Sequence, residues 1–161
     1  MDLADAVLFN EGPAARYLAG FPRPTNEWTD PARRHRTAVD AAIAADSRWA
    51  ASFAYRLQSG DVATVDAALL DLAKLARMQA DRLFGPDEVA RAEARAAGTD
   101  GVYVITPPYE QTSLDIVLHY IDVTYVIYIV AGDLTAEPGP TGRLLHEQFV
   151  YELATNLHTS H

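Results

Sequence analysis

The stretch "DVATVDAALLDLAKLARMQADRLFG", residues 61–85, predicts a long amphipathic helix. Asp61 suits the N-cap, because its carboxylate can accept hydrogen bonds from the free N–H groups of the first turn. Gly85 suits the position just after the last turn. Apolar side chains recur between these two residues every three or four positions, which places them on one face of the helix. They are Val62, Val65, Leu69, Leu72, Ala76 and Leu83.

The residues before this stretch predict another helix. Residues 29–60 begin with Thr29 or Asp30 as a candidate N-cap and have Pro31 at the first helical position. Proline is favoured there because the N–H that it lacks would have no partner inside the helix. Gly60 suits the end of the helix. We therefore expect one helix over this range.

Two more helical patterns follow in the second half of the chain. Residues 86–97 begin with a proline and two acidic side chains, which the positive end of the helix dipole favours, and Gly98 follows them. The run "RLLHEQFVYELATNL", residues 143–157, has no glycine or proline and carries apolar side chains at helical spacing. It predicts a C-terminal helix over about 141–157.

The region between these helices has the composition of strands. "GVYVIT", residues 101–106, is a short β-branched and aromatic run that ends at two prolines. "VTYVIYIVA", residues 123–131, is apolar on both faces, as in a buried strand. Two structures remain open for residues 114–121. A helix would place Asp115, His119 and Asp122 on one face, whereas a strand would place Asp122 opposite the other two.

These patterns predict an α+β fold. Its parts are a helical N-terminal layer (about 30–97), a small β-sheet (about 101–131) on which that layer packs, and the C-terminal helix (about 141–157). We expect a single domain over residues 1–161. Its parts are an N-terminal arm with short helices (1–28), the helical part (29–98), and a strand-rich part that ends in a helix (99–161).

Composition excludes several classes of protein. The chain has 161 residues and no cysteine, so disulfides, thiol catalysis and thiolate-bound metals are excluded. Residues 1–100 carry 12 basic and 15 acidic side chains, whereas residues 101–161 carry one basic and seven acidic side chains. The net charge of −9 argues against binding to nucleic acid or anionic lipid. We expect a soluble cytoplasmic protein with no membrane partner, because Asp115, His119 and Asp122 interrupt its most apolar run.

Several polar side chains are weak candidates for chemistry. His119, Asp122, His146 and Glu147 could act as acid–base groups, and Asp115, His119 and His146 could hold a metal. The simpler interpretation is a solvated helix face. His146 and Glu147 match the start of the zinc-protease HExxH pattern, but Val150 stands where the second histidine would be.

The densest basic run is "RRHR", residues 33–36, in the first turns of a predicted helix. Arg33, Arg34 and Arg36 could bind a phosphate there together with free helical N–H groups. Four consecutive residues point all round a helix, however, which favours a solvated surface paired with nearby carboxylates.

Two functional hypotheses follow. The first is a non-catalytic protein-interaction or assembly protein, such as an immunity protein, an adaptor or a structural subunit. It would have an acidic surface and would bind a basic partner or associate with itself. The second is a small-ligand- or metal-binding protein, or an enzyme, with a pocket between sheet and helices that uses His119, Asp122 and His146. The sequence argues against an enzyme without excluding one, and it implies no cofactor.

Overall fold

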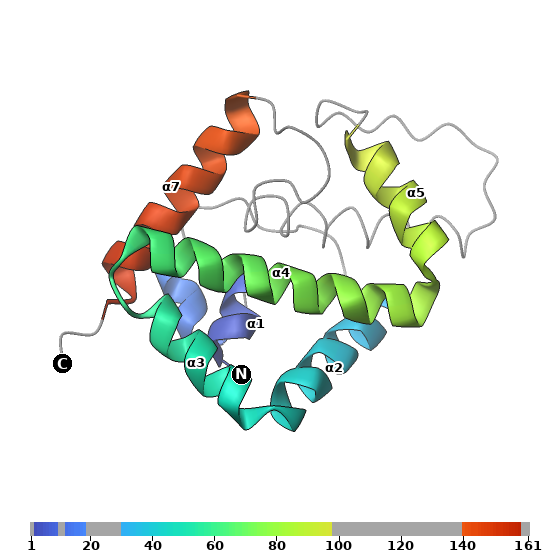
Figure 1. Ribbon diagram of the computed structural model, residues 1–161, viewed down its shortest axis with the longest axis horizontal. Coiled ribbons are helices and arrows are strands. Elements are labelled where there is room, and N and C mark those ends of the chain that lie inside the picture. The colour runs from blue at the N-terminus through green and yellow to red at the C-terminus, as the bar shows by residue number, and fades with distance from the viewer. Residues whose placement is uncertain (1, 10–11, 19–29, 98–139, 159–161) are drawn as a thin grey trace.

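The computed structural model describes residues 2–9, 12–18, 30–97 and 140–158, and nearly all of these residues are helical (Figure 1). The helices are α1 (Asp2–Phe9), the 3-10 helix η1 (Pro13–Leu18), α2 (Asp30–Ala45), α3 (Ser47–Leu57), α4 (Val62–Phe84), α5 (Pro86–Ala97) and α7 (Pro140–Asn156).

Helix α4 is the centre of the structure. It contacts α2, α3, α5 and α7, while α1 packs on η1 (Figure 1). In the view of Figure 1, α2 and α3 lie below α4, and α5 and α7 rise from its opposite ends. Every long helix among the described residues therefore buries part of its surface against one neighbour, α4.

The main hydrophobic core lies around the first two thirds of α4. Val65, Leu69 and Leu72 are completely buried, and α3 and α7 contribute Leu57 and Leu153, which are also fully buried. Alanines fill much of the remaining contact surface of α4, at positions 68, 73 and 76. Small side chains let the helices approach closely.

The predicted start and end of the central helix are confirmed. The Asp61 carboxylate accepts a hydrogen bond from the Thr64 backbone N–H at 2.8 Å, and Gly85 follows the last turn with a φ of +91°. The predicted apolar stripe is right in its middle and wrong at its ends, because Val62 is 48% exposed and Leu83 is 42% exposed.

The single helix expected over residues 29–60 is wrong. The chain forms two helices there, α2 and α3, which are separated by Asp46. The Asp46 carboxylate accepts a hydrogen bond from the Trp49 backbone N–H at 2.9 Å and so caps α3. A short polar side chain that can bond to the backbone competes with helix continuation, and here it starts a new helix in another direction. Gly60, with a φ of +75°, lies in the turn after α3.

The α+β prediction is wrong. Among residues 2–9, 12–18, 30–97 and 140–158 there is no strand. The other long helices pack on helix α4 instead of on a sheet. The segments expected to form the sheet, residues 101–106 and 123–131, lie outside the described residues, as does the alternative helix or strand over 114–121. The C-terminal helix and the helix over 86–97 are confirmed as α7 and α5.

Candidate functional site

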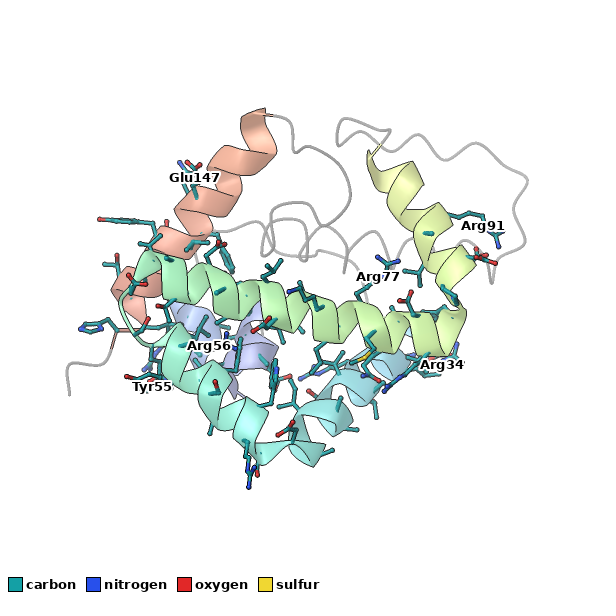
Figure 2. The ribbon with its side chains drawn as sticks, in the orientation of Figure 1. Arg34, Tyr55, Arg56, Arg77, Arg91 and Glu147 are labelled. Atoms are coloured by element: carbon teal, nitrogen blue, oxygen red, sulfur yellow. The ribbon has the colours of Figure 1, made fainter. Side chains whose placement is uncertain are left out.

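Three of the candidate site residues, two of them in the predicted pocket and one a candidate metal ligand, lie outside the described residues. Asp115, His119 and Asp122 belong to this part of the chain. His146 and Glu147 lie in α7, where the Glu147 side chain is exposed (Figure 2). The pocket that would combine these groups stays a prediction. In the part of the chain that the structure describes, no group of three histidine or acidic side chains is arranged to hold a metal ion.

The three arginines of the basic run, residues 33–36 in α2, lie in different environments. Arg33 is exposed and pairs with the Asp30 carboxylate one turn before it. Arg34 is exposed and lies at the end of the molecule where α2 approaches the C-terminal end of α4 (Figure 2). Arg36 lies 3.3 Å from a carboxylate oxygen of Asp5. Two of the three guanidinium groups predicted to bind a phosphate therefore already have carboxylate partners.

The histidine of the same run is buried. The His35 side chain is 1% exposed, and its Nε2 donates a hydrogen bond to the main-chain carbonyl of Ala76 in α4 at 2.9 Å. Burial lowers the pKa of His35 below its usual value, and the bond to the Ala76 carbonyl offsets part of this effect. His35 is therefore a neutral polar side chain in the contact between α2 and α4 at pH 7.

A second, smaller hydrophobic cluster lies next to this histidine. The Phe84 ring at the end of α4 is tilted at 51° to the imidazole of His35, with ring centroids 6.5 Å apart. Phe84 also packs against Ala80 and against Val89 of α5, both of which are buried. One aromatic ring thus joins α2, α4 and α5, and we call this contact the α2–α4–α5 junction, formed by His35, Phe84, Ala80 and Val89.

A group of charged side chains connects α1 to α2. The Arg36 guanidinium lies between Asp5 of α1, at 3.3 Å, and Asp40 of α2, at 3.7 Å. Burial and the neighbouring Asp5 carboxylate raise the pKa of Asp40, although Arg36 acts in the opposite direction. A similar pair joins α3 to α4, with Arg56 Nη1 and Asp71 Oδ2 2.8 Å apart (Figure 2). These pairs fix the orientation of neighbouring helices.

The helices on the two sides of residues 98–139 are both held by α4. Helix α5 ends at Ala97 and packs on α4, and α7 begins at Pro140 and also packs on α4 (Figure 1). The two helices that flank residues 98–139 in the sequence therefore share a common packing partner. None of the described helices is both long enough and apolar enough to cross a membrane.

The sequence contained a signal for the buried histidine that the charge pattern concealed. His35 lies four residues before Val39 and eight before Ile43, both of which are buried in the core. Residues at this spacing share one face of a helix. His35 therefore belongs to the apolar stripe of α2, although three arginines surround it in the sequence.

Comparison with known proteins gives one match. A family model described as "sporulation delaying protein family toxin" matches residues 1–158. No curated protein and no solved structure matches the chain. The match extends over nearly the whole chain, so it includes the helical body and residues 98–139 alike. The chain belongs to the sporulation delaying protein family of toxins.

Proposed function

We propose that this protein is a toxin that acts on target cells by binding, with residues 101–131 as the part that engages the target. The helical body of α1–α5 and α7 is then the carrier of this apolar segment. The observation that carries the proposal is the placement of the two helices beside the segment, because α5 and α7 both pack on α4.

The sequence of the segment supports this division of roles. Residues 123–131 contain no side chain that is charged at pH 7, whereas the chain as a whole has a net charge of −9. An apolar run of this kind gains free energy when a target surface removes it from water. The chain belongs to a toxin family, and a toxin needs a surface that contacts its target. The segment is the strongest candidate in the chain for apolar contact with a target.

The target surface is either a lipid bilayer or a protein. Residues 114–131 are nearly as long as the roughly 20 residues that cross hydrocarbon as a helix. Asp115, His119 and Asp122 would each oppose insertion into hydrocarbon, which was our reason for expecting no membrane partner. A protein with a basic surface would instead complement the acidic C-terminal part of the chain.

A growth assay tests the proposal. Purified full-length protein is added to a growing culture of a spore-forming bacterium, and optical density, spore number and uptake of a membrane-impermeant dye are measured. We expect growth to slow. Dye uptake at the onset of this effect would identify a bilayer as the target, whereas growth inhibition without dye uptake would identify a protein partner.

The same substitution at two valines separates segment from carrier. Val126→Asp places a charge in the apolar segment, and we expect it to abolish inhibition. Val62→Asp is the matched control, because Val62 is 48% exposed at the first position of α4, where the helix dipole favours an acidic side chain. Inhibition that survives Val126→Asp, or a wild-type protein without effect on growth, would overturn the proposal.

This function replaces the cytoplasmic, oligomeric assembly protein expected from the sequence. Membership of a toxin family gives no support to that expectation. The proposal keeps one part of that expectation, namely that the protein acts by binding a partner. The growth assay tests this part directly.

A further inference from the structure

We propose that the α2–α4–α5 junction is an acid-sensitive contact, in which protonation of His35 loosens α5 from α4. The inference rests on the proposed function in one respect: α5 leads directly into the segment that we assign to target binding. Acid would then weaken the hold of the helical body on the N-terminal side of that segment.

The first step is the position of the imidazole. His35 is 1% exposed, and its Nε2 lies 2.9 Å from the Ala76 carbonyl oxygen in the middle of α4. A second proton would place a full positive charge in a contact made of α2, α4 and the Phe84 ring. A buried charge without water is costly, so the protonated side chain favours any rearrangement that admits solvent.

Several charged groups on the three helices pair with one another. On α2, Asp40 and Arg36 pair, and Arg33 pairs with Asp30. On α4, Arg77 pairs with Asp81, and on α5, Arg91 pairs with Glu88. Each pair contains one positive and one negative group. Each of these carboxylates would have to leave its own cation to compensate a charged His35.

The second step is the contact that attaches α5 to α4. The main core contains side chains of α1, η1, α2, α3, α4 and α7, and none from the described side chains of α5. Val89 of α5 is buried instead in the small cluster with Ala80 and Phe84. Because Phe84 lies against His35, a change at the imidazole reaches the contact that holds α5.

Hydrogen–deuterium exchange of the full-length protein at pH 7.5, 6.0 and 5.0, corrected for the intrinsic pH dependence of exchange, tests this inference. We expect the protection of residues 86–97 to fall below pH 6.5, by up to about tenfold per pH unit for a single proton. Helix α3, which packs in the main core, is the internal reference and should change much less.

Two variants identify the titrating group. His35→Gln keeps an amide that can donate to the Ala76 carbonyl but cannot gain a proton, and we expect it to make α5 protection independent of pH. His158→Gln is the matched control, because His158 is exposed beyond the end of α7, and it should behave like the wild type. The proposal would be overturned if acidification reduced the protection of α5 as much in His35→Gln as in the wild type. It would also be overturned if acidification did not reduce this protection in the wild type.

An NMR titration of the wild-type histidines gives a second measurement that needs no variant to fold. The His35 ring signals should titrate with the same midpoint as the loss of α5 protection. A His35 midpoint that differs from the midpoint of this loss would refute the inference. These readouts do not involve toxicity, so the failure of the growth assay and the failure of this proposal are distinguishable.

Discussion

Leu72→Ala tests whether α4 is the central core helix. Leu72 is completely buried, as are Val65, Leu69 and Ala76 on the same face. Leucine-to-alanine substitutions in cores cost about 2–5 kcal/mol, depending on how far the surroundings relax into the space. Alanines line much of this face and cannot extend into a cavity, so we expect a loss of about 3–4 kcal/mol in the free energy of unfolding.

The assay is urea denaturation followed by circular dichroism at 222 nm, with Leu83→Ala as the matched control on the same helix. Leu83 is 42% exposed, so its truncation should change the free energy of unfolding by about 0.5 kcal/mol or less. A loss of about 3 kcal/mol lowers the melting temperature by roughly 6–12 °C in a chain of this size. Equal effects of the two substitutions would refute the placement of α4 at the centre of the core.

Three further predictions concern single side chains. Asp46→Ala removes the cap of α3 and should lower the free energy of unfolding by about 1 kcal/mol in urea, whereas no change would show that the break between α2 and α3 does not depend on this cap. Gln79→Leu should raise it by about 1 kcal/mol, because the buried Nε2 of Gln79 has no hydrogen-bond partner among the residues that the structure describes, and a destabilised variant would contradict this. The raised pKa of Asp40 means that folding disfavours its ionised form, so wild-type stability gains from protonation of Asp40 as the pH falls through that pKa. The free energy of unfolding of Asp40→Asn, relative to that of the wild type, should therefore be highest at pH 7 and should lose this gain by pH 3.5. A difference in urea midpoints that does not change with pH would refute the assignment.

The histidine and the carboxylate act in opposite directions with pH. Folding lowers the pKa of His35, so its neutral form gives full stability above the unfolded-state value of about 6.5, and this contribution is lost as the pH falls. Asp40 contributes with the opposite sign, because folding raises its pKa. A loss of stability on acidification is therefore the effect expected from His35, and a gain is the effect expected from Asp40.

The candidate site was only partly accessible from the sequence. The arginines of residues 33–36 drew attention to α2, but their charges concealed the residue that is buried. The spacing of His35, Val39 and Ile43 indicates a buried face, yet no local pattern pairs His35 with Ala76, which lies 41 residues later. That pairing depends on how α2 crosses α4, which is a property of the packed helices.

The sequence by itself determined where several helices begin and end. Asp61, Gly85 and Pro86 act through hydrogen bonds and backbone angles within one turn, so their effects are local and readable from neighbouring residues. Tertiary structure decided what those helices pack on. An apolar helix face can be buried by a sheet or by another helix, and the alanine-rich face of α4 allows helices to approach closely enough to provide the surface. The sequence pattern is the same in both cases, because burial depends on contacts between residues far apart in the chain.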